Sequence, residues 1–263
     1  MQSDSFDPHS FVEIKFHGNL PGLLKKKIRG KSLVSYALNR RTSVKDVCES
    51  LGIPHPEVDL ITANNITVGF DYILCPRDYI EITPISAKTD FLKFSYLRVA
   101  SLTEYRFIVD VNVAKLARWL RLLGFDAMYE NGFNDDELAK ISGDSKRILL
   151  TKDCNLLKRK NVVFGHLVRE DDPEKQIIEI VTLYNLQHKI QPYTRCLRCN
   201  GILGYVDKKD IDHLLEPLTR KYYDTFHQCR QCQQVYWHGS HRSKIEKDLQ
   251  AVLVKCGIKE KSN

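Results

Sequence analysis

Four cysteines have the spacing that is most typical of metal binding. They form two C-x-x-C pairs, Cys196 with Cys199 and Cys229 with Cys232, and 29 residues lie between the pairs. Two such pairs supply four thiolates in tetrahedral geometry, which is the arrangement of a closed structural zinc site. We therefore expect Zn²⁺ here rather than free thiols or disulfides. The ion should stabilise the small unit around it and take no part in catalysis.

Acidic residues follow several of the apolar runs that we predict to be strands of one parallel sheet. Asp110 and Asp153 come after such runs, the Asp135-Asp136 pair opens a helix between them, and Glu170-Asp171-Asp172 follows a further run. Because the carboxyl ends of parallel strands share one edge of a sheet, these carboxylates are expected to converge on one cleft. Carboxylates so close together repel one another unless a cation lies among them. Mg²⁺ or Mn²⁺ is the predicted cation, since hard ions with oxygen ligands are the usual agents of phosphodiester hydrolysis.

Each of these acids also has a structural interpretation as a helix N-cap. Asp153 is placed to cap a short helix over 154–159, and Asp135 resembles a cap more than a ligand. Asp172 precedes a proline that suits the first position of a helix, so a cap is the favoured interpretation there. Asp110 taken alone favours neither role. The joint pattern, rather than any one acid, indicates an active site.

The helix predicted after Asp110 carries basic side chains. Its apolar residues recur at the i, i+3, i+4, i+7 spacing of one buried face, while Lys115, Arg118 and Arg121 fall on the opposite face. Lys115 and Arg118 are candidates for contact with substrate phosphates, although a solvated helix face explains them at least as well. Thr151 and Asn112 are placed to position groups beside the acids.

Aromatic and histidine residues follow the second cysteine pair. Tyr236 and Trp237 lie next to basic residues in a pattern that suits base stacking, and His241 suits phosphate contact. Packing of the two rings against the neighbouring domain is the alternative, and we favour it for Trp237. His241 stays a candidate substrate-binding residue.

The N-terminal part of the chain predicts an α+β roll. Residues 11–17 alternate apolar and polar side chains as a strand does, and Ser43 is placed to cap a helix over Val44–Leu51. With the short strands that follow, this indicates a ubiquitin-type β-grasp over residues 10–86. The run SVKDVCESLGIPHPEVD resembles the sulfur-carrier branch of this fold, but the last strand continues into Pro84 instead of a Gly-Gly tail. We therefore expect a docking or structural module rather than a sulfur carrier.

The rest of the chain is predicted to form an α/β domain and a zinc ribbon. Strands that alternate with helices at this spacing indicate βαβ units and a parallel sheet. The predicted segments after the β-grasp domain are a linker over 87–104, the α/β domain over 105–190, the zinc ribbon over 191–245, and a C-terminal helix and tail over 246–263.

Composition and charge limit the class of protein. The chain has 263 residues, of which 43% are hydrophobic and 28% charged, as in ordinary soluble proteins. No apolar run approaches the roughly 20 residues that span a bilayer, and the polar N-terminus lacks the features of a signal peptide. We predict a cytoplasmic protein without membrane contact. The net charge of +7 suits a polyanionic partner and, equally, a solubilising surface.

Several ordered blocks resemble one nuclease family. DVNVAKLARWLRLLGFD, DDEL, RILLTKD and LVREDD, followed by RCLRCNGIL and QCRQCQQVYWHGSH, look like the Mut-seven C-terminal RNase family, a branch of the PIN-like nucleases. The resemblance covers about residues 105–245, and the β-grasp segment is similar to the companion domain of many bacterial members. It implies a PIN-like fold and a metal-dependent ribonuclease that acts on RNA.

The resemblance also assigns roles to particular residues. The family's acids map onto Asp110, Asp136 and Asp153, with Asp171 as a weaker fourth, and Asp110 and Asp153 would hold one Mg²⁺ or Mn²⁺ ion. Ala114 stands where members often have glycine, which is a mild departure. Because PIN-like domains often dimerise, a homodimer is an expectation, and the β-grasp domain implies a protein partner that the sequence does not identify.

The function predicted from the sequence is metal-dependent hydrolysis of RNA phosphodiester bonds at a cluster of aspartates. The alternative is a non-catalytic RNA-binding or adaptor protein. In that case the acids would be helix caps, and the zinc ribbon and basic surface would provide the contact with RNA.

Overall fold

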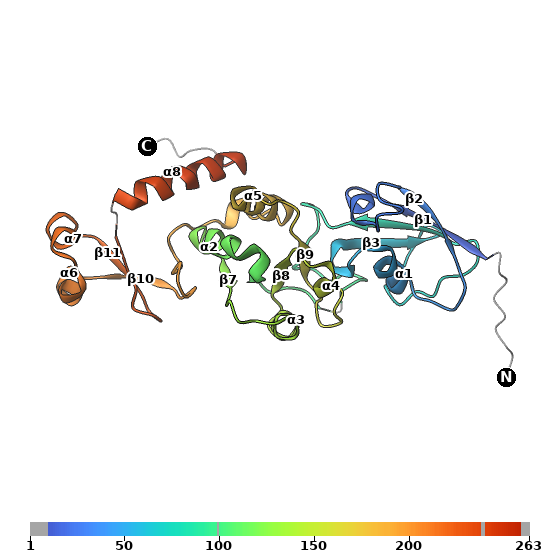
Figure 1. Cartoon of the computed structure of the whole chain (residues 1–263), viewed down its shortest axis with the longest axis horizontal. Helices are drawn as coiled ribbons and strands as arrows, with labels where there is room; N and C mark the ends of the chain where they lie inside the picture. Colours follow the sequence, from blue (N-terminus) through green and yellow to red (C-terminus); the bar gives the residue numbers. More distant parts are fainter. Residues whose placement is uncertain (1–9, 99, 238–239, 259–263) are drawn as a thin grey trace. The chain divides into compact units, whose positions relative to one another are not determined.

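The computed structural model describes residues 10–98, 100–237 and 240–258, except for the side chains of 240–245 (Figure 1). The chain divides into two units. The first contains residues 1–104 and 133–167, and the second contains 105–132 and 168–263. Part of the predicted α/β domain therefore packs with the N-terminal domain in one unit.

The N-terminal domain is built on a mixed five-stranded sheet. Its strands are β1 (Phe11–Phe16), β2 (Leu33–Ala37), β3 (Val58–Ala63), β4 (Ile66–Thr67) and β5 (Tyr79–Pro84). They lie in the order β2-β1-β5-β3-β4, with β1 parallel to β5 and the other neighbours antiparallel. The helix α1 (Val44–Leu51) has the predicted bounds, and short helical turns form η1 (Leu20–Leu23) and η2 (His55–Glu57). The predicted β-grasp architecture is confirmed.

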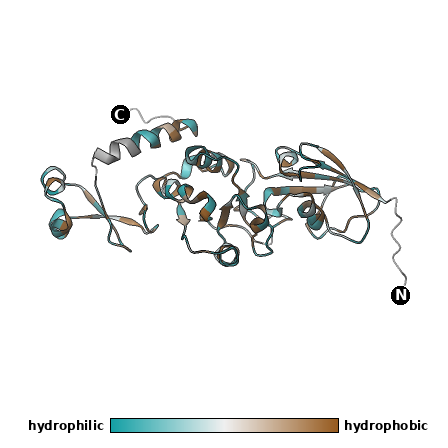
Figure 2. Ribbon diagram, in the orientation of Figure 1, coloured by the Kyte–Doolittle hydropathy of each residue, from teal (hydrophilic) through white to brown (hydrophobic). Residues whose placement is uncertain are grey.

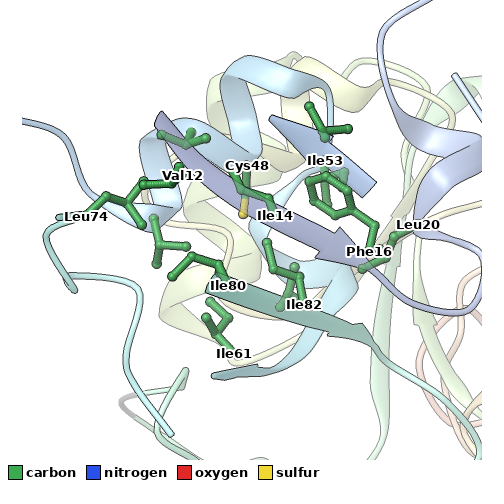
Figure 3. Close-up of a cluster of buried hydrophobic side chains, with 14 of the residues drawn as sticks. Val12, Ile14, Phe16, Leu20, Cys48, Ile53, Ile61, Leu74, Ile80 and Ile82 are labelled. Atoms are coloured by element: carbon green, nitrogen blue, oxygen red, sulfur yellow. The ribbon is translucent and has the colours of Figure 1, made fainter. Parts of the chain in front are cut away.

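Alternating apolar residues of the central strands form the core of this domain. Ile14 and Phe16 of β1 and Ile80 and Ile82 of β5 are buried, and Figure 3 shows them in one cluster with Cys48 of α1. Burial raises the pKa of the Cys48 thiol to about 12. The thiol therefore stays protonated and packs as a small apolar group.

Residues 87–104, predicted as a linker, pack against the N-terminal sheet. Phe91 and Arg98 are buried, and the Arg98 guanidinium lies 4.8 Å from the centre of the Phe91 ring. The same guanidinium donates to the Asp59 carboxylate at 3.3 Å and to the Val58 carbonyl at 3.1 Å. A segment without regular periodicity is thus held by a buried cation, which a pattern of apolar residues does not reveal.

The α/β region contains two parallel strand pairs, one in each unit. β6 (Arg106–Val109) pairs with β7 (Asp126–Met128), and β8 (Ile148–Thr151) pairs with β9 (Gly165–Leu167). Every residue of β8 is buried, as expected for a parallel strand that is covered on both faces. The helical elements are η3 (Val111–Val113), α2 (Ala114–Leu122), α3 (Asp135–Asp144), α4 (Cys154–Leu157) and α5 (Pro173–Leu183). The predicted α/β class with parallel strands is confirmed.

Helix α2 has the predicted apolar face, but its three basic residues divide. Leu116 and Leu120 are buried, and Lys115 and Arg118 are exposed. Arg121, which the periodicity places on the solvated face, is 5% exposed. Its side chain is covered because it donates hydrogen bonds to the backbone carbonyls of Leu197 and Arg198, which lie between the first two cysteines of the ribbon.

The predicted zinc ribbon is a three-stranded antiparallel sheet in the order β10-β11-β12. Its strands are β10 (Leu203–Val206), β11 (Phe226–Cys229) and β12 (Val235–Trp237), and its helical elements are α6 (Lys208–Ile211), η5 (Asp212–Leu214) and α7 (Pro217–Tyr222). The short turn η4 (Gln187–Lys189) precedes the ribbon. The side chains of Ile211, Leu215 and Phe226 form a small apolar core. So small a core makes a bound metal an important source of stability.

The last helix is α8 (Ser240–Lys255), which begins earlier than the predicted boundary at 246. Leu249 and Val252 are buried, and α8 contacts α5. Figure 2 shows hydrophobic and hydrophilic residues interspersed along the coloured part of α8, as expected of a helix with one apolar side. Among the described residues, no helix is long and apolar enough to cross a membrane.

Candidate functional site

The four predicted zinc ligands come together at one end of the ribbon sheet. The Sγ atoms of Cys196, Cys199, Cys229 and Cys232 all lie within 4.8 Å of one another, with 3.6 Å between Cys196 and Cys232 and 3.4 Å between Cys199 and Cys229. A tetrahedral zinc site with Zn–S bonds of about 2.3 Å has sulfur atoms about 3.8 Å apart, whereas a disulfide needs about 2.05 Å. The cluster therefore fits Zn²⁺ and does not fit disulfides.

Hydrogen bonds to two of the cysteine sulfur atoms favour their thiolate form. The backbone N–H groups of Cys199 and Cys232 point at the sulfur atoms of Cys196 and Cys229, each at 3.5 Å. Burial raises the pKa of Cys196, but bonds from the Tyr236 hydroxyl and from backbone amides outweigh it and bring the pKa to about 6. Without metal, burial and the neighbouring thiols raise the pKa of Cys199 to about 12. A bound cation would favour the thiolate form of all four ligands.

The residues after each cysteine pair have the backbone conformation that a tight metal-binding turn needs. Asn200 and Gln233 have positive φ angles of 70° and 60°, which bend the chain back toward the sulfur atoms. Gly201 follows in the first turn, and a Cβ atom at this position would lie 2.8 Å from the Cys229 sulfur. The C-x-x-C-N-G sequence therefore closes the cluster because only glycine leaves room for the facing cysteine.

The first cysteine pair is anchored on α2 and β7 by buried polar contacts. Arg121 donates to the Ala127 carbonyl at 2.9 Å and to the carbonyls of Leu197 and Arg198 at 3.2 and 3.0 Å. Burial lowers the pKa of Arg121, yet a guanidinium stays charged and can satisfy several carbonyls at once. The Asn200 side chain continues this anchor, since it accepts from the Ala127 N–H at 3.0 Å.

Asp110 lies directly after β6 and is 6% exposed. It stands at the N-cap position of η3, but its side chain makes no capping hydrogen bond. Instead, the Asn112 side-chain amide donates to Asp110 Oδ2 at 2.6 Å. The cap interpretation is therefore wrong for Asp110, and Asn112 orients the carboxylate as the sequence predicted.

Asp153 does cap a helix. Its Oδ1 accepts from the N–H groups of Asn155 and Leu156 at the start of α4, and its own N–H donates to the Thr151 hydroxyl at 2.9 Å. Both capping bonds use Oδ1. Capping and cation binding are thus compatible, because the second carboxylate oxygen takes no part in the cap.

Asp136 lies in the first turn of α3 and is exposed. The N-cap of this helix is Asn134, which forms a capping box with Glu137, so the prediction of Asp135 as the cap is wrong. Arg159 pairs with both aspartates of this turn. The sequence could not show this partner, because Arg159 follows a different helix.

Asp171 is exposed just before α5. The cap of α5 is Asp172, which accepts from the N–H groups of Glu174 and Lys175 at 3.0 and 3.1 Å. The predicted cap with proline at the first helical position is therefore confirmed. Asp171 as a fourth acid of the active site stays a prediction.

The predicted substrate-binding residues differ in their exposure and contacts. Lys115 and Arg118 are exposed on α2 and form no ion pair within the described part of the chain, so they are accessible to phosphate. The side chain of His241 lies outside the described residues. Trp237 is 37% exposed. Tyr236 instead packs against the cysteine cluster, with its hydroxyl oxygen 3.1 Å from Cys196 Sγ.

Two protein-family models match the chain. The Mut7-C RNAse domain matches residues 105–249, which is more than half of the 263 residues. The chain belongs to the Mut7-C RNAse domain family. The Mut7-C ubiquitin model matches residues 9–90, so the predicted arrangement of a ubiquitin-like domain before the RNAse domain is confirmed. No curated protein and no solved structure was found to match the chain.

The acids of this Mut7-C RNAse domain offer a donor set that suits a hard divalent cation. Asp110 presents a buried carboxylate, and Asp153 presents an oxygen outside its cap; such oxygens are the ligands that Mg²⁺ and Mn²⁺ prefer. Asp110 and Asp153 belong to different units, so their convergence stays a prediction. Among the described residues, the four cysteines are the one group of three or more His, Cys, Asp or Glu side chains close enough to share an ion.

Sequence reasoning missed several polar residues that hold the Mut7-C RNAse domain in place. Arg121 anchors the cysteine pair, although its helical position suggested solvent. Glu57 and His166 are fully buried and lie 2.8 Å apart. The apolar residues on both sides of His166 in the sequence were a usable signal, because a polar residue within such a run must find a buried partner.

Proposed function

We propose that this chain is a metal-dependent ribonuclease that hydrolyses RNA phosphodiester bonds at its aspartates. The single observation that carries the proposal is Asp110, a buried carboxylate at the end of β6 in a Mut7-C RNAse domain. The carboxyl ends of parallel strands are where α/β domains hold their ligands. Asp110 does not cap the turn that follows it. A role at such a ligand site therefore explains why an aspartate is buried at the end of β6.

In this proposal Asp110 and Asp153 hold a Mg²⁺ or Mn²⁺ ion, and Asp136 and Asp171 complete the acidic site. When bound, the ion lowers the pKa of a coordinated water molecule and stabilises negative charge on phosphoryl oxygens. Asn112 keeps the Asp110 carboxylate in a fixed orientation through its hydrogen bond to Oδ2. Arg159 holds Asp136 and must exchange this ion pair for cation contact if Asp136 becomes a ligand.

Exposed cations support RNA as the substrate. Lys115 and Arg118 lie on α2, within about two turns after Asp110, and can attract the phosphate groups that flank the cleaved bond. His241 is a further candidate for this contact. The net charge of +7 favours association with a polyanion, and the zinc ribbon contributes structure rather than chemistry.

The test is Mn²⁺-dependent cleavage of a panel of single-stranded and structured RNAs. Wild type is compared with the double variant Asp110→Asn/Asp153→Asn, in which both side chains keep their shape and residue 153 keeps its cap. Asp172→Asn is the matched control, because it removes an acidic charge from a helix cap and leaves the four acids of the proposed site unchanged.

We expect the cleavage rate of the double variant to fall on the order of 100-fold or more. Even the change of a residue that only supports a metal ligand lowers metal affinity or activity about 10- to 100-fold. Asp172→Asn should cleave as wild type does, with zinc content and melting temperature matched. RNA binding without cleavage by wild type would contradict the proposal and favour the adaptor function.

A further inference from the structure

We propose that the ubiquitin-like domain supports the active site by fixing the position of Asp153. The inference rests on the proposed function, in which Asp153 is a ligand of the divalent ion. Residues 1–104 and 133–167 form one unit, and α1 of the ubiquitin-like domain and α4 of the nuclease region lie in it together (Figure 1). Three sets of polar contacts join the ubiquitin-like domain to α4, to the loop after α4 and to β9.

The first set joins the C-terminal end of α1 to α4. Lys158, which directly follows α4, donates from Nζ to the Glu49 backbone carbonyl at 2.8 Å. The Cys154 thiol donates to the Gly52 carbonyl at 3.3 Å. The C-terminal carbonyls of a helix carry partial negative charge, so an ammonium group is a favourable partner for them. Both ends of α4 are thus tied to one end of α1.

The second set is made by His55, which is 7% exposed. One ring nitrogen lies 2.8 Å from the Glu49 carboxylate, and the other lies 2.7 Å from the Val162 carbonyl. His55 therefore bridges α1 and the loop between α4 and β9. A buried bridge of this kind fixes the distance between the two elements that it joins.

The third set is made by Glu57, which is fully buried in η2. Its carboxylate accepts from the Leu167 N–H at 2.7 Å and lies 2.8 Å from His166 Nδ1. His166 and Leu167 belong to β9, the strand that pairs with β8. Because a buried carboxylate is stable only with partners of this kind, the ubiquitin-like domain and β9 depend on each other.

These contacts matter for Asp153 because α4 cannot position itself. The helix has four residues, and a single turn in isolation is unstable. Asp153 is held on one side by Thr151 at the end of β8 and on the other by its cap on α4. Contacts that fix α4 therefore also fix the carboxylate of Asp153, as outer partners do for metal ligands elsewhere.

The experiment compares Lys158→Met with Lys160→Met in the full zinc-loaded chain. Both variants remove one lysine charge and keep an unbranched side chain, but Lys160 is exposed, and the described residues show no hydrogen bond or ion pair from it to α1. Mn²⁺ binding is measured by titration calorimetry, and amide hydrogen exchange is followed over 152–159. Lys158→Arg tests rescue, and Glu57→Gln tests the separate contact on β9.

We expect Lys158→Met to weaken Mn²⁺ binding about tenfold and to speed exchange over 152–159, with the KM for RNA unchanged. Lys158→Arg should restore both values, Lys160→Met should alter neither, and Glu57→Gln should weaken Mn²⁺ binding with little loss of zinc. Equal Mn²⁺ binding and equal exchange in the two methionine variants would overturn this inference alone. Failure of wild type to bind Mn²⁺ would overturn the proposed function, and unchanged exchange in Lys158→Met would then overturn the docking contact as well.

Discussion

The cysteine cluster and the aspartates are both metal-binding features by prediction, and they are built in opposite ways. The cluster takes its ligands from two short motifs, which the register of β10 and β11 brings together. The aspartates lie at the ends of separate strands and helices, in two units. In the cluster the spacing of the ligands along the chain already specifies the site, whereas for the acids only the fold can do so.

The two features also differ in what else their side chains can do. Four cysteines at this spacing have no common structural role other than metal binding or disulfide formation. An aspartate has an ordinary second role, and Asp153 and Asp172 both perform it as helix caps. Asp110 does not. The comparison shows that an aspartate can be taken as evidence for a metal site only after a role as a helix cap has been tested.

Loss of zinc should give the largest effect and the sharpest contrast between the two features. Cys229→Ser removes one thiolate, and structural zinc sites bind with an apparent free energy of about 10 kcal/mol or more. We expect the variant to purify without zinc and to lose hydrogen-exchange protection over β10–β12. The sheet β1–β5 should keep its protection, because its core is built from apolar side chains.

The matched control is Cys75→Ser, since Cys75 is exposed and lies outside the cluster. It should retain one zinc ion per chain. Lowering the pH should release zinc from wild type, because protons compete with the metal for thiolates. Protected ribbon strands in zinc-free Cys229→Ser would show that the apolar core is sufficient and that the cluster is not the source of stability.

Arg121→Met tests whether the cysteine pair depends on the helix that follows Asp110. The variant removes the hydrogen bonds to the carbonyls of Ala127, Leu197 and Arg198, and we expect a loss of about 2 kcal/mol in the free energy of unfolding. Arg121→Lys should recover only part of it, because an ammonium group cannot reach the same set of carbonyls.

Denaturant unfolding of the zinc-loaded chain measures this loss, and Arg118→Met is the control on the exposed face of the same helix. A surface change of that kind should stay within about 0.5 kcal/mol. Equal stability of the two variants would mean that the buried guanidinium is a tolerated group and not an anchor.

Much of the fold was predictable because its determinants are local. The alternation in β1, the bounds of α1 and the apolar run of β8 follow from side-chain periodicity. The packing of residues 87–104 around Arg98 could not be predicted in this way. Its position depends on one cation above a phenyl ring and two partners on β3, and no periodic pattern encodes such a contact.

The same distinction holds for the candidate sites. The grouping of the four cysteines was predicted from their spacing, and Asn112 was correctly placed beside Asp110. Arg159 as the partner of Asp136, and Glu57 as the partner of His166, could not be predicted. Each of these pairs joins residues that are distant in the chain, and charge pairing by itself does not select one partner among many.

The two roles of Asp153 can be separated by two substitutions at the same position. Asp153→Ala loses the cap and the carboxylate, whereas Asp153→Asn loses the charge but keeps an oxygen for the N–H groups of α4. We expect the alanine variant to be about 1 kcal/mol less stable than the asparagine variant, measured by thermal unfolding. Both should lose Mn²⁺ binding to a similar degree, because an amide is a poor substitute for an anionic ligand.

Asp110 provides the internal control for this last test. The Asp110 side chain caps no helix. The stabilities of Asp110→Ala and Asp110→Asn should therefore not differ because of a lost cap, and both variants should bind Mn²⁺ more weakly. A stability difference at 153 without one of the same size at 110 would show that one acid serves fold and chemistry together. If Asp153→Asn binds Mn²⁺ as wild type does, the carboxylate of Asp153 is a cap alone and not a metal ligand, in contrast to the role predicted for the four cysteines.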